Sequence, residues 1–301
     1  MFATIDIGTN SVLLLIGKAL PDKNVRIIED HATVTRIGQN LSKTNLISEE
    51  SSVRTLDCLI QYSKLCAKHS VTNVAIVGTY ALRQAKNSEN FLREVKNATG
   101  WEIEIISPER EAQLTFNAST HDFGENIIVI DIGGGSTEFI CKNNWKSFSI
   151  GCVNLTENYI KNDPPNDHEI NELRTHVHNL FNLQLDPLSY AHPHDRVFVA
   201  TAGTATTLMA MKLELRNYSA EKVHGQELKL TDLRNIIDLL KSKSINDRKN
   251  LIGLAPERAD IILPGALILH EAMSYLGFTS VTISDRGVRY GLFYEKTCTY
   301  G

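Results

Sequence analysis

The chain contains a short internal repeat that limits the folds open to it. Ile5–Ser11 and Ile130–Ser136 share the pattern I-D-I-G-x-x-S. In both copies an apolar strand reaches an aspartate, continues into a glycine turn and leads into a second apolar strand. Two matching β-hairpins, one in each half of the chain, predict two related domains that face each other across a cleft.

The length and the composition agree with two packed domains. The chain has 301 residues, and domains average about 150 residues. Hydrophobic residues make up 42% and charged residues 22%, which excludes a disordered, collagen-like or coiled-coil chain. The net charge of −4 argues against a general nucleic-acid binder or a membrane-surface protein, although a local basic patch could still hold a polyanionic substrate.

The apolar N-terminus predicts a buried strand and not a signal peptide, because it lacks leading basic residues and carries Asp6 early. The longest apolar run, near Val12–Ile16, is far shorter than the roughly 20 residues of a membrane span. The cysteines form no CxxC pair, so neither a disulfide framework nor a zinc site is indicated. We therefore expect a cytoplasmic protein that binds no membrane and no nucleic acid.

Hydrophobic periodicity predicts alternating strands and helices in both halves. The expected strands are Phe2–Ile7, Val12–Leu20, Val25–Thr35, Val74–Val77, Glu102–Ile106, Ile127–Ile132, Thr137–Cys141, Ser147–Ile150, Val197–Ala200 and Val281–Ser284. The expected long helices are Ser48–His69, one from Ser107, Asp167–Leu183, Gly203–Leu213, Thr231–Leu240, Ile261–Leu276 with an interruption at Pro264, and Arg286–Lys296. Ser48, Ser107 and Thr231 are the expected N-caps.

Both hairpin turns suit phosphate binding. Glycines let the backbone approach a phosphate, consecutive N–H groups form an anion nest, and hydroxyl and amide side chains add donors. The candidate residues are Gly8, Thr9, Asn10 and Ser11 in the first turn, and Gly133, Gly134, Gly135 and Ser136 in the second. The alternative for a single copy is an ordinary tight turn. An aspartate beside a phosphate needs a metal ion between them, or it orients a water molecule.

Four further segments at strand ends each have two interpretations. Arg83 is a phosphate clamp or an exposed helix arginine. The acidic residues of Ser107–Leu114 are catalytic, or they only stabilise the helix by interacting with its dipole. Gly203-Thr204 opens a helix for anion binding or for close packing. Ser284–Gly291 belongs to a site or forms ion pairs at a domain junction.

Taken in order, these segments resemble the exopolyphosphatase / guanosine pentaphosphate phosphohydrolase (Ppx/GppA) family of the actin-like, sugar-kinase and heat-shock ATPase superfamily. The resemblance covers nearly the whole chain and rests on Asp6–Ser11, Tyr80–Arg83, Ser107–Leu114, Val129–Glu138, Ala202–Thr204 and Ser284–Glu295. It implies an α/β protein of two ribonuclease-H-like (actin-like ATPase) domains with a cleft between them. The implied domains are residues 1–111 with 286–301, and residues 112–285.

The resemblance also implies roles for individual residues. The family's catalytic base lies in an S-G-x-E-E-A motif, which places it on Glu111, with Glu109 as the second choice. Arg110 and Pro108 depart from that motif. Mg²⁺ is the implied cofactor, with Asp6, Asp131 and Glu138 as its candidate ligands. The residues implied to bind substrate phosphates are those of the two turns with Arg83, Gly203 and Thr204.

The function implied is a Mg²⁺-dependent exopolyphosphatase that releases orthophosphate from the end of inorganic polyphosphate. A guanosine pentaphosphate (pppGpp) 5′-phosphohydrolase is the nearest alternative, because it cleaves the same kind of bond. A kinase or ATPase of the superfamily and a non-catalytic polyphosphate or alarmone sensor are further alternatives, which Glu111 disfavours. The family also suggests a homodimer.

Overall fold

The computed structural model describes residues 1–20, 25–186, 190 and 196–297, and the chain divides into two compact units. Unit 1 comprises Met1–Ala118 and Val288–Gly301, and unit 2 comprises Ser119–Gly287. The expected boundaries, at residues 111 and 285, lie a few residues before these, because Ala118 still packs in the core of unit 1. The expected cleft stays a prediction.

Unit 1 is built on a five-stranded sheet in the order β3-β2-β1-β4-β5. Its strands are β1 (Phe2–Ile7), β2 (Ser11–Ala19), β3 (Val25–Val34), β4 (Asn73–Gly78) and β5 (Glu104–Ile105). In the β1–β3 part of the sheet each strand is antiparallel to its neighbour, whereas β4 and β5 run parallel to β1. This is the expected ribonuclease-H-like arrangement.

Unit 2 repeats this topology. Its sheet has the order β10-β11-β9-β6-β7-β8. The strands are β6 (Ile127–Ile132), β7 (Thr137–Cys141), β8 (Asn144–Phe148), β9 (Val197–Thr201), β10 (Glu227–Lys229) and β11 (Ser280–Ile283). Counted from β8 to β11, the order and the strand directions are those of unit 1, and β10 is an antiparallel addition. The duplication that the sequence repeat predicts is therefore confirmed.

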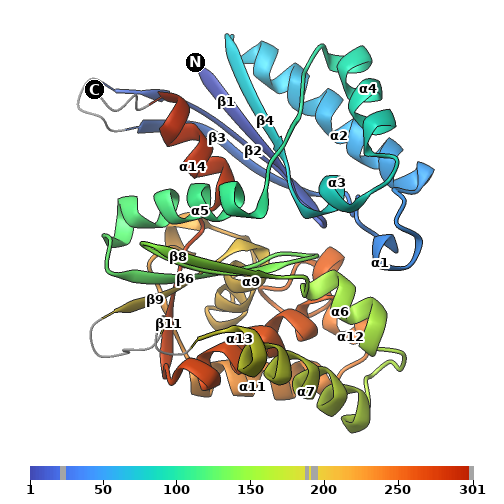
Figure 1. The fold of residues 1–301 in the computed structure, drawn as a ribbon, viewed down its shortest axis with the longest axis vertical. Coiled ribbons are helices and arrows are strands. Elements are labelled where there is room, and N and C mark those ends of the chain that lie inside the picture. Colours follow the sequence, from blue (N-terminus) through green and yellow to red (C-terminus); the bar gives the residue numbers. More distant parts are fainter. Residues whose placement is uncertain (21–24, 187–189, 191–195, 298–301) are drawn as a thin grey trace. The chain divides into compact units, whose positions relative to one another are not determined.

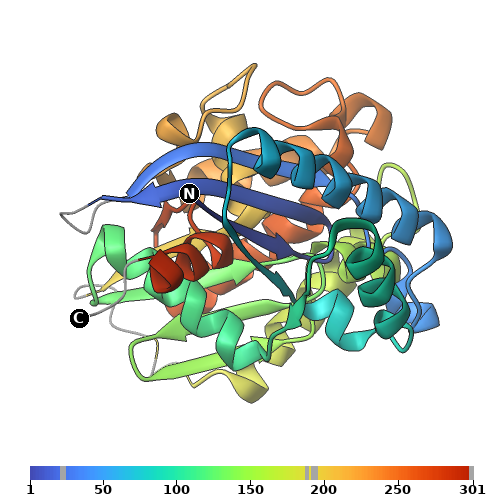
Figure 2. The same cartoon turned by 90° about the horizontal axis from the view of Figure 1, so that it is seen from above.

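Helices cover both faces of the unit 1 sheet (Figures 1 and 2). The helices of this unit are α1 (Leu41–Thr44), α2 (Glu49–Lys68), α3 (Tyr80–Gln84), α4 (Ser88–Thr99), α5 (Pro108–Phe123), which continues into unit 2, and α14 (Val288–Thr297). Because side chains alternate along a strand, Leu14 of β2 joins the core beneath α2 and α4, whereas Leu15 packs against α14 on the other face. The Thr4 hydroxyl fixes α14 by donating to the Arg289 carbonyl at 2.8 Å.

The helices of unit 2 form its main core with one face of the sheet. They are α6 (Cys152–Tyr159), α7 (Asp167–Gln184), α9 (Ala202–Lys212), α10 (Ala220–Val223), α11 (Leu230–Lys241), α12 (Ile245–Arg248), the 3₁₀ turn η1 (Pro256–Arg258) and α13 (Ile262–Leu276). Ile128, Ile130 and Ile132 of β6 point into this core, where α7, α9, α11 and α13 meet. Figure 1 shows α7, α11 and α13 close together in this layer.

Several predicted helix ends are confirmed and others are wrong. The Ser48 hydroxyl caps α2 at the Ser51 N–H (3.2 Å), and the Ser107 hydroxyl caps α5 at the Arg110 N–H (3.1 Å). Helix α13 is not interrupted at Pro264, because this proline lies in the first turn, where its missing N–H has no helical acceptor. Helix α11 begins at Leu230 without the predicted Thr231 cap, and α14 begins at Val288.

None of the described helices is both long enough and apolar enough to span a bilayer.

Candidate active site

The first hairpin turn lies at the carboxyl end of β1. The Gly8 N–H donates to the Ser11 carbonyl at 3.0 Å, and the tip residues Thr9 and Asn10 are each only 6% exposed. The Asn10 amide donates to the Ser11 hydroxyl at 3.3 Å, while its Oδ1 is buried and meets no hydrogen-bond partner among the described residues. A buried acceptor left in this way fits a turn that completes its hydrogen bonds with a ligand or its water. Asp6 is also buried there.

Glu111 and Arg83 meet at the same edge of the unit 1 sheet. The parallel strands β1, β4 and β5 end there, and α3 and α5 begin just beyond. Arg83 Nη1 donates to the Ile106 carbonyl at 2.7 Å and to Glu111 Oε2 at 3.1 Å. Within the described part of the chain both contacts use Nη1, so Nε and Nη2 of Arg83 remain for other acceptors.

The structure distinguishes the two candidate glutamates. Glu111 is 9% exposed, whereas Glu109 is exposed to solvent. Between them, Arg110 turns away and pairs with Glu295 of α14. The only one of the two that contacts Arg83 is therefore Glu111, the residue that the motif alignment selects.

The second hairpin turn reproduces the first and is held by α6. The Gly133 N–H donates to the Ser136 carbonyl at 3.0 Å, as in the first turn. The N–H groups of Cys152 and Val153 bind the carbonyls of Gly133 and Gly134 at 3.0 and 2.9 Å. In a trans peptide the C=O and the next N–H point in opposite directions. The N–H groups of Gly134 and Gly135 therefore point together away from α6, as in an anion nest.

Only a glycine fits beside this turn at position 151. A Cβ on Gly151 would lie 2.4 Å from the carbonyl carbon of Gly134 and 2.6 Å from the nitrogen of Gly135. The close approach lets the start of α6 reach the turn.

Asp131 and Glu138 form a pair of carboxylates across β6 and β7. They are direct partners in the antiparallel register, so both side chains lie on one face of the sheet. They are 9% and 2% exposed, and the Ser147 hydroxyl donates to Glu138 Oε1 at 2.7 Å. In the first hairpin the same register places Leu13 opposite Asp6. Only the second hairpin therefore carries two facing carboxylates.

This carboxylate pair fits a magnesium ion. Within the described residues, no three or more His, Cys, Asp and Glu side chains are grouped to hold a metal ion by themselves. Mg²⁺ typically takes one or two carboxylates and completes its shell with water and substrate phosphates, unlike a structural metal in a full protein cage. Asp131 and Glu138 match that donor set beside the glycine turn, and Asp6 offers a single carboxylate in unit 1.

Sequence analysis missed Arg258 of η1, whose side chain reaches the start of α9. Ala202 has a φ of 68°, a strained value for a residue with a Cβ. The Arg258 guanidinium covers Gly203 so closely that a Cβ there would lie 2.1 Å from Nη1. Burial lowers the pKa of this guanidinium. By contrast Thr204 is 2% exposed and packs against Gly265 of α13, as the close-packing interpretation expects.

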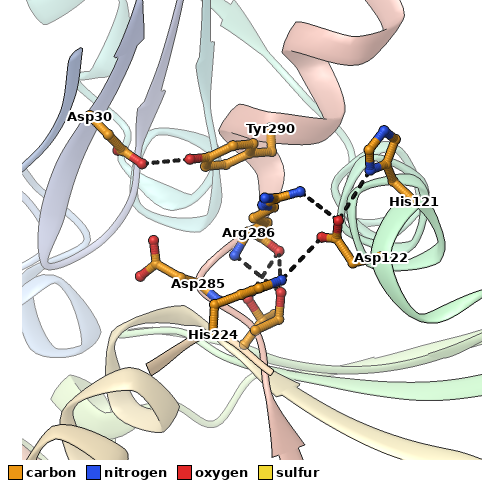
Figure 3. Close-up of polar contacts among 9 residues, drawn as sticks. Asp30, His121, Asp122, His224, Asp285, Arg286 and Tyr290 are labelled. Atoms are coloured by element: carbon orange, nitrogen blue, oxygen red, sulfur yellow. Dashed lines mark hydrogen bonds and ion pairs between the residues drawn. The ribbon is translucent and has the colours of Figure 1, made fainter. Parts of the chain in front are cut away.

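The segment after β11 forms ion pairs and hydrogen bonds within unit 2 (Figure 3). Arg286 pairs with Asp122 of α5, whose other oxygen lies 3.5 Å from His224 Nε2. The Asp285 N–H donates to His224 Nδ1 at 3.2 Å, and the Asp285 carboxylate accepts from Tyr218. Burial lowers the pKa of His224. Arg286 therefore forms an ion pair, as one of the two interpretations of this segment expects, and both partners belong to unit 2.

Figure 3 also shows the Tyr290 hydroxyl donating to Asp30 within unit 1, at 2.8 Å. Arg289 donates to both oxygens of Asp30 at 2.9 and 3.0 Å. These contacts tie the start of α14 to β3.

Comparison with known proteins identifies the family. Residues 18–299 match the Ppx/GppA phosphatase family. The chain belongs to this family. Two curated relatives differ in how much of their length the chain covers. It is 31% identical to a bifunctional 3-dehydroquinate synthase/phosphatase of Fusobacterium nucleatum, over 97% of the chain but only 46% of that protein. It is 30% identical to exopolyphosphatase 2 of Mycobacterium tuberculosis, over 96% of both chains.

Other Ppx/GppA relatives agree with this assignment. A guanosine-5′-triphosphate,3′-diphosphate pyrophosphatase of Vibrio atlanticus is 28% identical over 98% of the chain, which spans 59% of that protein. The crystal structure of the Aquifex aeolicus Ppx/GppA family member superposes with a TM-score of 0.82 at 30% identity, over 100% of this chain and 99% of that one.

Proposed function

We propose that this member of the Ppx/GppA phosphatase family is an exopolyphosphatase that uses Glu111 as general base and Mg²⁺ as cofactor. The observation that carries the proposal is the Arg83–Glu111 contact, at 3.1 Å, beside the glycine turn of unit 1. A buried carboxylate next to a phosphate turn repels the substrate unless a cation neutralises part of its charge. Arg83 supplies that cation and keeps Glu111 in one position.

The chemical step needs little from the protein besides position and charge. A water oxygen forms a bond to the terminal phosphorus as the anhydride P–O bond breaks, and the shortened polyphosphate leaves with the bridging oxygen. Glu111 accepts the proton that the attacking water gives up. Arg83 can hold Glu111 through Nη1 while Nε and Nη2 donate to a phosphate oxygen, because a guanidinium offers donors along two edges.

Unit 2 by itself offers further groups that can bind phosphate oxygens. In unit 2 the N–H groups of Gly134 and Gly135 point together, and Arg258 lies over the start of α9. When bound, Mg²⁺ would neutralise phosphate oxygens, and Asp131 and Glu138 are the residues that would hold it. Such preorganised charges lower the barrier because they need no rearrangement in the transition state.

The choice of substrate follows the relative with the higher identity. The chain is 30% identical to the relative named exopolyphosphatase 2 and 28% identical to the relative named guanosine-5′-triphosphate,3′-diphosphate pyrophosphatase. We therefore propose inorganic polyphosphate as the substrate ahead of pppGpp, although both end in a phosphoanhydride.

Phosphate release from polyphosphate and from pppGpp, measured side by side with Mg²⁺, tests the proposal. We expect a higher kcat/KM for polyphosphate. A higher value for pppGpp would make the chain a pppGpp phosphohydrolase. ATP consumption that depends on a small acceptor would indicate a kinase, and tight binding of polyphosphate without turnover would indicate a sensor. Light scattering of the same preparation tests the expected homodimer.

A further inference from the structure

The tip of the first hairpin is held from behind by the segment that follows β3. We call this segment, Thr35–Asn40, the strap. The N–H groups of Thr35 and Arg36 donate to the Asn10 carbonyl at 3.0 and 2.9 Å, and the Gly38 N–H donates to the Thr9 carbonyl at 2.9 Å. The strap therefore binds both carbonyls of the turn.

These bonds also determine where the donors of the turn point. Each carbonyl shares a planar peptide with the next N–H, which points the opposite way. Because the strap fixes the Thr9 and Asn10 carbonyls, it directs the N–H groups of Asn10 and Ser11 away from itself. The contact is close, since a Cβ on Gly38 would lie 2.3 Å from the Thr9 methyl carbon.

The strap in turn is fastened to α2 by one side chain. Arg54 donates through Nε to the Thr35 carbonyl at 3.0 Å and through Nη2 to Gln39 Oε1 at 3.1 Å. Two residues of its own helix orient the guanidinium: Ser51 Oγ accepts from Nη2 at 2.8 Å, and Glu50 accepts from Nη1. Arg54 thus binds the strap at two positions, Thr35 and Gln39, while residues of α2 fix its own orientation.

We propose that Arg54 is a positioning residue that sets the geometry of the first phosphate turn through the strap. The inference rests on the proposed function, in which that turn binds substrate phosphates. Arg54 does not touch the turn, and its effect passes through Thr35 and Gln39 to the carbonyls of Thr9 and Asn10. A lysine cannot replace it, because an ammonium lacks the planar fork that reaches two acceptors at once.

In unit 2 a different side chain, Asn154, holds the corresponding segment behind the second turn. After β8, the strand equivalent to β3, the N–H groups of α6 bind the carbonyls of the second turn. There Asn154 accepts from the Gly151 N–H at 2.7 Å and donates to the Gly135 carbonyl at 2.8 Å. Both units therefore use one polar side chain to fix the segment behind the turn.

The test compares Arg54→Ala and Arg54→Lys with Arg93→Ala as a matched control. Arg93 lies on α4 in the same unit, where it donates to Asn90 at 2.6 Å. Hydrogen exchange reports the amides of Thr35, Arg36 and Gly38, and steady-state kinetics on polyphosphate separates KM from kcat. We expect both Arg54 variants to exchange these amides about tenfold faster, and to raise KM about tenfold with kcat nearly unchanged, because uniform phosphate binding is lost. Arg93→Ala should match the wild type.

Three results would overturn the positioning role. They are unchanged exchange of the strap amides, an unchanged KM despite faster exchange, and full rescue by Arg54→Lys. Gln39→Ala removes one of the two strap contacts at an exposed position, so it tests the same idea without threatening the fold, and its KM should lie between those of the wild type and Arg54→Ala.

The experiment also distinguishes failure of the positioning role from failure of the proposed exopolyphosphatase function. If the wild type releases no phosphate, calorimetry with inorganic tripolyphosphate and Mg²⁺ replaces the kinetics. Weaker tripolyphosphate binding by Arg54→Ala together with faster strap exchange still supports the positioning role, whereas wild-type affinity in Arg54→Ala overturns it. An enzyme that binds no tripolyphosphate overturns both proposals.

Discussion

Arg83 and Glu111 come from different helices of unit 1 and form a partly buried ion pair through a single guanidinium nitrogen, at 3.1 Å. The strand ends that precede α3 and α5 bring them together. This arrangement couples the residue that we assign as base to a residue that can also bind phosphate. Changes to either one should therefore affect catalysis in separable ways.

Replacing Glu111 removes the proton acceptor. We expect Glu111→Gln to lower kcat by about 10² to 10⁴, the usual range for a lost general base, with polyphosphate affinity largely kept. Initial rates and calorimetric binding of tripolyphosphate check this. Glu109→Gln, at an exposed position two residues away, is the matched control and should behave as the wild type. Normal turnover by Glu111→Gln with loss in Glu109→Gln would assign the base to Glu109.

Removing one of the facing carboxylates should weaken the use of Mg²⁺. We expect Asp131→Asn to lower kcat/KM at least about 100-fold and to raise the Mg²⁺ concentration needed for half-maximal rate, because a metal contributes several kcal/mol of charge stabilisation. Asp6→Asn should shift the Mg²⁺ dependence less, since Leu13 stands opposite Asp6. Asp285→Asn, whose carboxylate accepts from Tyr218, is the control. Full activity in excess EDTA would exclude the metal.

A methyl group on Gly203 tests Arg258 without deleting it. The Cβ would lie 2.1 Å from Nη1, so the guanidinium must move. If Arg258 binds phosphate, Gly203→Ala should raise KM about 10-fold or more, because a charge-assisted hydrogen bond contributes roughly 1.5–3 kcal/mol. The double variant with Arg258→Ala should then be no worse than Arg258→Ala alone. Additive losses would show that the alanine acts in another way.

The stability of unit 2 should depend on Glu271 in a pH-dependent manner. Burial alone would raise the pKa of this carboxyl, but hydrogen bonds from His270 and Arg174 outweigh burial and hold the pKa below its usual value. His178 also faces it, at 3.9 Å. The unfolded chain then binds the proton more tightly than the folded one. Stabilisation by Glu271 is therefore complete above the unfolded pKa, about 4.3, and is lost as the pH falls through the folded pKa.

Denaturant titrations of the wild type and Glu271→Gln check this. The difference in unfolding free energy should be largest near pH 7 and shrink below about pH 4.3. Glu172→Gln, on the exposed side of α7, should show almost no difference at any pH. If the difference in unfolding free energy between the wild type and Glu271→Gln stays constant down to pH 3.5, the lowered pKa of Glu271 is contradicted.

The repeat and the apolar strands were sufficient to predict the architecture. A run such as Ile127–Ile132 is buried along its whole length, and only a central strand covered on both faces needs that pattern. The hairpin turns were predictable because their chemistry is local. The start of α11 was not, since Lys229 precedes the helix without any side-chain cap and tertiary packing decides where it begins.

Residues joined only through the fold were beyond sequence analysis. Arg83 and Glu111 were selected separately, and their contact depends on where β4 and β5 end. Arg258 belongs to no motif in the sequence, and only the fold brings it to Gly203. Arg54 donates to the backbone carbonyl of Thr35, and such a contact leaves no pattern in the sequence. One clue was available: Ile37-Gly38 and Ile150-Gly151 follow equivalent strands, and both glycines pack against a hairpin turn.

The return of α14 to unit 1 has a consequence for biosynthesis. Phe293 and Tyr294 of this helix complete the core around Leu15, which is fully buried. Translation produces α14 only after the whole of unit 2, at about 5–20 residues per second. Unit 2 is one continuous segment, so all of its core residues leave the ribosome before α14 does. Until α14 follows, the sheet of unit 1 lacks the helix that covers Leu15. The Leu15 face of this sheet is where a chaperone would be needed.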